Sequence, residues 1–176
     1  RRNAQCCSSE VRRNDWEVNA GHLTKSKMKE APAMYQKILV PLDGSKLAEC
    51  ALPHVKNMVK DGSVGEVTLL NVVNVYIPGR GDLPGLSDVN VIRESLFMES
   101  RKYLADVESR LASEGIKVKT ESLEGNRPAD IISDYAQKNG IDMIVIVTHG
   151  YTGLKRLMLG SVALGVLHES HMPVLL

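Results

Sequence analysis

Short apolar runs alternate with segments of helical periodicity along most of this chain. The intervening segments place apolar side chains three and four positions apart, as one buried face of a helix does. Alternation of this kind predicts an α/β domain, in which a parallel sheet carries helices on both faces. The predicted strands cover residues 37–41, 67–73, 118–123, 141–147 and 173–176.

Glycine, proline and asparagine mark where the helices between these strands begin and end. The connection over residues 74–90 is rich in Gly and Pro, and its length favours a functional lid or a mobile loop. Pro128 suits the first turn of a helix, and Asn139-Gly140 closes the same helix. We therefore expect helices over residues 48–59, 96–111, 128–138 and 162–167.

Residues 1–33 lack apolar periodicity and differ in charge from the remainder. They hold seven Lys and Arg against four Asp and Glu, a difference of +3, whereas the whole chain has a net charge of +1. We interpret this segment as a disordered or non-native basic extension, with a regulatory arm as the less favoured alternative. The folded domain is expected over residues 34–176.

Composition argues against several classes of partner. Aromatic residues make up 4% of the chain and the net charge is +1, so neither the stacking rings nor the field of a nucleic-acid-binding surface is expected. No apolar run approaches the ~20 residues of a membrane span. The three cysteines, two of them adjacent, do not form a disulfide framework, which favours a reducing, cytoplasmic location.

Two loops follow predicted strands and have the composition of ligand-binding loops. The first is residues 41–45, which include Asp43, and the second is residues 148–161. Parallel α/β sheets bind ligands beyond the carboxyl ends of their strands. Glycines in the second loop allow close backbone approach, and Gly160-Ser161 opens a helix whose free N–H groups suit a phosphate. Turn formation alone is the competing explanation for both loops.

Other polar residues give weaker signals. Asp43 has no second carboxylate beside it in the sequence, so acid–base catalysis is not supported. His149 is expected to orient the glycine loop rather than to act as a base. His168 and His171 resemble half of a metal site and lack further ligands nearby in the sequence. We predict no catalytic residue and no metal ligand.

Both ends of the predicted domain resemble the universal stress protein family, of the adenine nucleotide alpha-hydrolase-like superfamily. The resemblance lies in residues 34–45, residues 148–163 and residues 172–176, and it extends over essentially all of residues 34–176. It implies a single Rossmann-like α/β domain with an open five-stranded parallel sheet in the order 3-2-1-4-5.

The nucleotide-binding branch of that family carries a Gly, two residues, a second Gly, nine residues, and a third Gly followed by Ser or Thr. Gly150, Gly160 and Ser161 match the later positions. Val147 stands where the first Gly is expected, and Tyr151 stands where a basic residue is common. These two departures leave open a narrowed pocket or weaker binding.

The resemblance also implies a set of ligand-binding residues. Asp43 would meet the ribose or base side of an adenine nucleotide, and Val72 would meet the adenine through its backbone. Mg²⁺ would accompany ATP. The predicted nucleotide-binding residues are Pro41, Leu42, Asp43, Val72, Val147, His149, Gly150, Gly153, Gly160, Ser161 and Val162.

These observations predict a stress-response regulator that binds ATP or AMP at the carboxyl ends of its first and fourth strands. The resemblance implies a homodimer through the last strand and a further protein partner. Two alternatives remain open at this stage. One is an interaction module that binds no nucleotide, which Val147 and Tyr151 favour. The other is a weak adenylate-processing enzyme, with at most slow ATP hydrolysis.

Overall fold

The computed structural model describes residues 33–75, 86–148 and 160–176. Residues Pro32–Leu176 form one compact unit. The predicted extension over residues 1–33 lies, apart from Ala33, outside the described residues. The elements are β1 (Tyr35–Pro41), the 3-10 helix η1 (Ala48–Ala51), α1 (Leu52–Lys60), β2 (Val64–Val73), α2 (Leu86–Ser113), β3 (Val118–Glu124), α3 (Pro128–Lys138), β4 (Met143–Val145), α4 (Ser161–Glu169) and β5 (Val174–Leu175).

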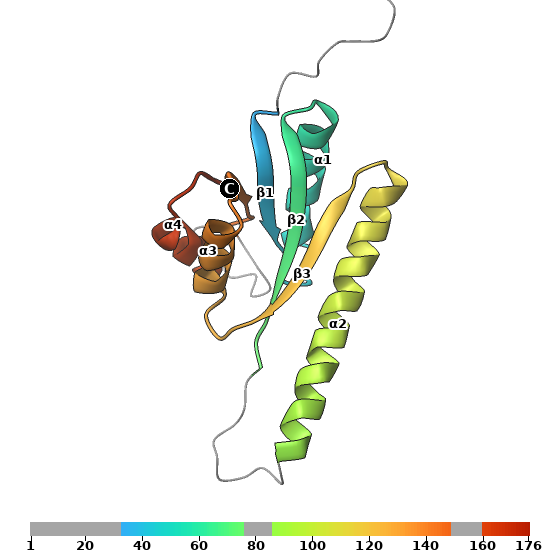
Figure 1. Ribbon diagram of the computed structural model, residues 1–176, viewed down its shortest axis with the longest axis vertical. Coiled ribbons are helices and arrows are strands. Elements are labelled where there is room, and N and C mark those ends of the chain that lie inside the picture. The colour runs from blue at the N-terminus through green and yellow to red at the C-terminus, as the bar shows by residue number, and fades with distance from the viewer. Residues whose placement is uncertain (1–32, 76–85, 149–159) are drawn as a thin grey trace, which may run out of the picture. The chain divides into compact units, whose positions relative to one another are not determined.

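All five strands form one parallel sheet in the order β3-β2-β1-β4-β5, which confirms the predicted order (Figure 1). Strand β1 is central, because it pairs with β2 on one side and β4 on the other. Its residues Ile38, Leu39 and Val40 are each 0% exposed. Full burial on both faces explains why this strand reads as a continuous apolar run.

The two faces of the sheet carry different helices. Ile38 and Val40 pack with η1, α1 and α2 in one core cluster. Leu39, whose side chain points to the opposite face, packs with α3 and α4 in a second cluster. Figure 1 shows α1 and α2 on one side of the strands and α3 and α4 on the other. The predicted helices on both faces are therefore confirmed.

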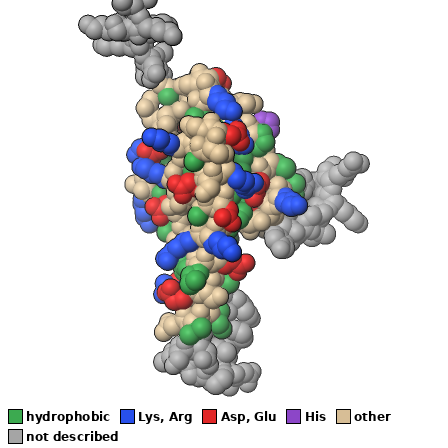
Figure 2. All heavy atoms as spheres, turned by 90° about the vertical axis from the view of Figure 1, so that its right-hand side faces the viewer, with side chains coloured by type: hydrophobic (Ala, Val, Ile, Leu, Met, Phe, Trp, Pro, Cys, Tyr) green, Lys and Arg blue, Asp and Glu red, His purple; other side chains and the backbone are tan. Residues whose placement is uncertain are grey.

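Lys and Arg side chains lie interspersed with Asp and Glu over the face that includes α2 (Figure 2). Two ion pairs lie at the β3 edge of the sheet: Lys119 of β3 pairs with Glu66 of β2, and Arg93 of α2 pairs with Glu124 at the end of β3. This face consequently lacks the single-signed stripe that a nucleic-acid-binding surface carries.

The predicted first helix, residues 48–59, is wrong in one respect, because the structure divides it into η1 and α1. Proline has no N–H group, so Pro53 cannot make the α-helical bond to Glu49, four residues before it. Leu52 instead donates its backbone N–H to the Glu49 carbonyl, which is the shorter 3-10 spacing. The first turn after the β1 loop is therefore a separate unit.

The second helix is longer, and the fourth strand shorter, than predicted. Helix α2 begins at Leu86, so residues 86–90 of the predicted irregular connection are helical. No Gly or Pro interrupts residues 86–113, whereas Pro84 and Gly85 immediately precede them. Strand β4 covers only Met143–Val145, because its pairing is limited to two residues on β1 and two on β5. Residues 76–85 lie outside the described part.

Helices α3 and α4 approach each other closely through two small residues. A Cβ atom added to Gly165 would lie 2.6 Å from the Cβ of Ala129. Neither atom belongs to the flexible end of a long side chain, so the contact cannot relax without moving a helix. Gly165 is therefore required for the close packing of α4 on α3.

Gly165→Ala is expected to lower the free energy of unfolding by up to about 2 kcal/mol. Helix propensity alone would favour Ala by about 1 kcal/mol, but overpacking a fitted contact costs about 1–3 kcal/mol. Urea denaturation measures the difference. The exchange variant Ala129→Gly/Gly165→Ala is the matched control and should recover most of the loss. A Gly165→Ala protein more stable than the parent would contradict this packing.

Candidate functional site

A cavity of about 260 Å³ lies at the carboxyl ends of β1, β2 and β4. The chain leaves β1 toward β2 on one side and later returns to β4 on the other, so the cavity sits where the strand order reverses. Ligands of open parallel α/β sheets occupy this position. The lining residues are Pro41, Leu42, Asp43, Ala48, Leu70, Val72, Pro128, Ile132, Ile146, Val147, Thr148, Gly160, Ser161, Val162 and Ala163.

The walls of this cavity are mainly apolar, with polar groups from a few lining residues. Leu42, Leu70, Ile132 and Ile146 are buried core residues that also face the cavity. Asp43, Thr148 and Ser161 supply polar side chains. An apolar pocket with a few convergent polar groups is typical of a small-molecule site, because the apolar area gives affinity and the polar groups fix orientation.

Asp43 holds the turn after β1 as well as bordering the cavity. Its Oδ1 atom accepts a hydrogen bond from the Ser45 amide at 2.9 Å. The Ser45 hydroxyl in turn accepts from the amide of Ala48, the first residue of η1, at 3.0 Å. Gly44 between them has φ +83°, a conformation that favours glycine. The turn-forming role weighed for Asp43 is thus present, together with its place at the cavity.

A chain of polar groups fixes the position of Leu42 at the cavity. The Asn71 amide donates to the Leu42 carbonyl at 2.7 Å, and the Ser100 hydroxyl donates to the Asn71 carbonyl oxygen at 2.7 Å. Ser100 also lies 2.7 Å from the Ser122 hydroxyl. The residues come from β2, α2 and β3, so three elements hold the loop after β1 in place.

The start of α4 differs in detail from the predicted phosphate-binding helix start at Gly160-Ser161. The Gly160 amide donates to the Thr148 carbonyl, which joins the two ends of the segment 149–159. This amide is therefore already bonded within the chain, and the predicted part of Gly160 in ligand binding stays a prediction. The helix has no side-chain cap, and no hydrogen bond joins the first-turn amides of Ser161 and Val162 to the described part of the chain. Free N–H groups and a partial positive charge remain there.

A second helix also begins at the cavity. Pro128 is the first residue of α3 and lines the cavity beside the start of α4. The preceding residue, Arg127, pairs with Asp130 at 3.1 Å, so its charge is partly compensated within the first turn. The proline signal for a helix start was visible in the sequence, but its position at the site was not predicted.

Eight of the eleven predicted ligand-binding residues border the same cavity. Three others, His149, Gly150 and Gly153, lie outside the described residues. The eight that border it are Pro41, Leu42, Asp43, Val72, Val147, Gly160, Ser161 and Val162.

Sequence reasoning missed the cavity residues that belong to strand interiors and helix faces. Such side chains carry only the signal of a hydrophobic core, and nothing local separates a core position from a cavity wall. Thr148 was part of the predicted loop but was not singled out. The missed residues are Ala48, Leu70, Pro128, Ile132, Ile146, Thr148 and Ala163.

Two further searches concern only the described residues. None of their helices combines the length and apolar character needed to cross a membrane. Among the same residues, no three His, Cys, Asp or Glu side chains gather closely enough to hold a metal ion.

The family model of the universal stress protein family matches residues 34–176. The chain belongs to this family. It is 38% identical over 154 residues to universal stress protein MJ0531 of Methanocaldococcus jannaschii, with 88% of each chain covered. The solved structure of MJ0577, a protein from the same organism, is 35% identical, with a TM-score of 0.68 and coverage of 81% of this chain and 95% of that chain. The resemblance seen in the sequence is confirmed.

More distant members of the family have been solved with nucleotides. A universal stress protein family protein of Arabidopsis thaliana, with AMP bound, is 18% identical, with a TM-score of 0.56 and coverage of 80% of this chain and 89% of that chain. A universal stress protein in complex with cAMP is also 18% identical, with a TM-score of 0.50. At this identity the likeness shows the shared fold alone.

Ser100→Ala is expected to lower the free energy of unfolding by about 1–3 kcal/mol, because it leaves the half-buried carbonyl oxygen of Asn71 without its donor. Chemical denaturation measures the loss. Ser113→Ala is the matched control on the same helix, since the Ser113 hydroxyl bonds only the exposed end of α2, to the Arg110 carbonyl. Its effect should stay within about 0.5 kcal/mol. Equal stability of the two variants would contradict the role given to Ser100.

Proposed function

We propose that this domain binds an adenine nucleotide, AMP or ATP, in the cavity at the carboxyl ends of β1 and β4, and acts as a stress-response regulator. One observation carries the proposal: an apolar cavity and an uncapped helix start lie side by side. A nucleotide is a ligand with one apolar, flat end and one anionic end. The two parts of the site match those two ends.

The size of the cavity supports one nucleoside rather than a larger ligand. Small-molecule pockets usually span ~300–1,000 Å³, and this cavity, at about 260 Å³, lies just below that range. Base and ribose would occupy the apolar part, between Val72 and Ile132. Asp43, in the turn after β1, borders the cavity and would face the ribose hydroxyls.

The phosphate would lie at the first turn of α4. The amides of Ser161 and Val162 are donors without partners in the described part of the chain, and the Ser161 hydroxyl is exposed beside them. Helix N-termini bind anions through these donors and through the helix dipole. Because the Gly160 amide already bonds the Thr148 carbonyl, we expect the amides of Ser161 and Val162 to contact the phosphate instead.

The ligands of distant relatives support the same division of the site. AMP and cAMP, each found with a universal stress protein, share adenosine and a single phosphorus centre. ATP would extend beyond the first turn of α4. Mg²⁺ would then be held mainly by phosphate oxygens, because the described residues offer no acidic cluster for it.

A second copy of the chain is the partner proposed for the last strand. Strand β5 is an edge strand of the sheet that the described residues form, and Leu175 on it is 41% exposed. An exposed edge with apolar side chains favours pairing with an identical edge. A regulator could use such a pairing to pass on the state of its nucleotide site to another protein.

The competing candidate is an interaction module that binds no nucleotide. Val147 favours it, because its side chain packs against the core cluster of α1 and α2 and also narrows the cavity. The two candidates differ in a calorimetric titration of the parent protein with AMP. The interaction module gives no binding heat at millimolar nucleotide, whereas the nucleotide site gives a saturable isotherm.

Ser161→Glu is expected to weaken AMP binding at least tenfold, because it places a carboxylate where the phosphate would lie. The same change should leave the melting temperature of the free protein unchanged or higher, since an acidic residue in a helix first turn is favourable by about 0.3–1 kcal/mol. Isothermal titration calorimetry and thermal unfolding measure the two effects separately.

Ser161→Gln is the matched control for this variant, since it has the size of Glu without the charge. It should bind AMP within about threefold of the parent protein. Unchanged affinity in the Glu variant would mean that the phosphate does not contact α4.

A further inference from the structure

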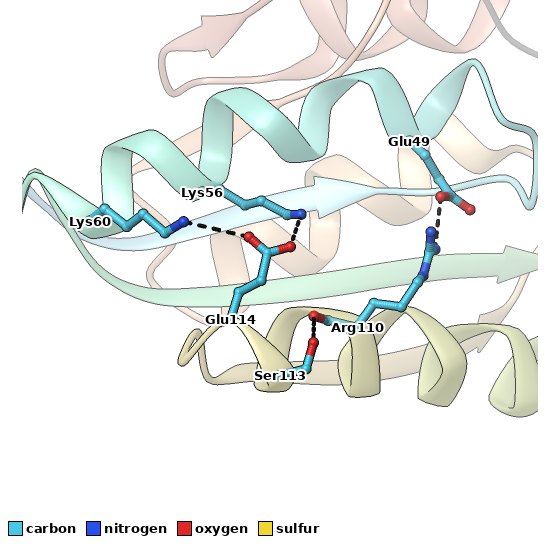
Figure 3. A network of polar contacts seen from close by, with 6 residues as sticks. All are labelled: Glu49, Lys56, Lys60, Arg110, Ser113 and Glu114. Atoms are coloured by element: carbon cyan, nitrogen blue, oxygen red, sulfur yellow. Dashed lines mark hydrogen bonds and ion pairs between the residues drawn. The ribbon is translucent and has the colours of Figure 1, made fainter.

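The two halves of α2 are attached to the domain very differently. The second half carries core residues and is joined to η1 and α1 by ion pairs (Figure 3). The core residues are Leu104, Val107 and Leu111. The ion pairs at this end of the helix are Arg110–Glu49, Lys56–Glu114 and Lys60–Glu114. In the first half, by contrast, residues 90–95 are all exposed. The described part of the chain thus leaves the first half of α2 largely uncovered.

The exposed part of α2 carries two large apolar side chains that face away from the core. Val91 and Met98 are each 68% exposed and lie two turns apart. By the helical repeat they lie opposite Ser100 and Val107, which are buried. Figure 2 shows hydrophobic side chains near the lower end of this face, where α2 begins. A helix segment exposed on all sides is only marginally stable in water, so this one gains from a packing partner.

An open hollow in the surface lies on the same side of α2. Its lining residues are Asn90, Val91, Glu94, Ser95 and Met98. The last four are spaced at i, i+3, i+4 and i+7, which are the positions that form a hole for one side chain of a facing helix. Methionine is long and flexible and fills irregular gaps well. This face of α2 therefore offers both a hole and, in Met98, a side chain that could fill one.

Two charged side chains indicate which facing helix fits the hollow. Glu94 and Arg101 lie two turns apart on one flank of this face, and neither forms an ion pair with a described residue. They are separated by about 10 Å along the axis, too far to pair within one helix. If a second copy of α2 runs antiparallel across this face, Glu94 of each copy lies beside Arg101 of the other. The face is self-complementary in charge, as a twofold contact requires.

We propose that the outer face of the first half of α2 (Val91, Glu94, Ser95, Met98 and Arg101) is a contact between two copies of this chain. The two α2 helices pack antiparallel, Met98 of each copy enters the hollow of the other, and Glu94 pairs with Arg101 across the contact. This inference does not depend on nucleotide binding.

The contact differs from the one proposed for β5. Helix α2 packs on β2 and β3, whereas β5 lies at the opposite edge of the sheet. A single pair of helices buries less than the ~1,200 Å² of a standard interface, so a weak and reversible association is expected. The fraction of associated protein should therefore rise with protein concentration.

Met98→Glu tests the contact, with sedimentation equilibrium of the full chain as the measurement. The change places a carboxylate in the hollow beside Glu94 and should weaken association at least tenfold. The melting temperature should be unchanged, because Met98 is 68% exposed in the single chain. Met34→Glu is the matched control, since Met34 is 78% exposed and precedes β1. It should associate as the parent protein does.

A charge exchange tests the antiparallel arrangement itself. Glu94→Lys and Arg101→Glu should each weaken association, because each places like charges side by side across the contact. The double variant Glu94→Lys/Arg101→Glu should associate within about threefold of the parent protein, since the pair is restored with its signs exchanged. Failure of the double variant to recover would refute the antiparallel pairing.

The remaining outcomes separate this contact from other occupants of the same face. A parent protein that stays monomeric at every concentration refutes the proposal. If another segment of the same chain covers this face, Met98→Glu lowers the melting temperature and leaves association unchanged, which also refutes it. Leu175→Glu should leave the α2 contact intact. Association that is lost in Leu175→Glu but kept in Met98→Glu would assign the contact to β5 alone.

Discussion

Strand β1 is buried on both faces, and this burial determines where the cavity forms. Ile38, Leu39 and Val40 are fully enclosed, two by α1, α2 and η1 and one by α3 and α4. Each such side chain contributes about 1.5–3 kcal/mol when removed from water. Burial on both faces requires helices on each, so the chain first adds β2 with α1 and α2 on one face and later returns to β4 with α3 and α4 on the other. The loops after β1 and β4 therefore diverge, and the space between them is the cavity.

The chemistry of the site follows from the same arrangement. The cavity has apolar walls because it borders the hydrophobic core. Leu70 and Ile146, for example, are buried core residues that also line the cavity. Among the described residues, polar character enters at the turn after β1, at Thr148 and at the first turn of α4. An apolar cavity beside backbone donors that have no partner in the described part of the chain is the basis of the nucleotide-binding proposal. The Asn71–Ser100 pair keeps that geometry fixed by anchoring the Leu42 carbonyl.

Much of the fold could be predicted because its signals are local. Continuous apolar runs such as residues 37–41 mark strands buried on both sides, and Pro128 and Gly140 mark the limits of α3. The boundary between η1 and α1 was also encoded locally, by Pro53, but apolar spacing concealed it. The start of α2 was predicted too late, because the Gly and Pro residues before Leu86 extended the expected loop.

The site was only partly predictable, because its decisive contacts join residues far apart in the sequence. Nothing near Gly160 indicates that its amide bonds the Thr148 carbonyl. In the sequence, Ser100 only interrupts the apolar face of a helix. Its partners, Asn71 of β2 and Ser122 of β3, are brought beside it by the fold. Cavity walls such as Ile132 have the same signal as the core. Local sequence predicts which loops meet, whereas long-range contacts decide which atoms remain free.

The amide resonances of the α4 first turn provide the most direct test of the central claim. In a nitrogen–proton correlation spectrum, titration with AMP should shift the Ser161 and Val162 amide signals most, together with those of Val72 and Asp43 at the cavity. Saturation of all four with a single dissociation constant would agree with one nucleotide bridging the apolar cavity and the helix start. Unchanged Ser161 and Val162 signals at saturating AMP would contradict it.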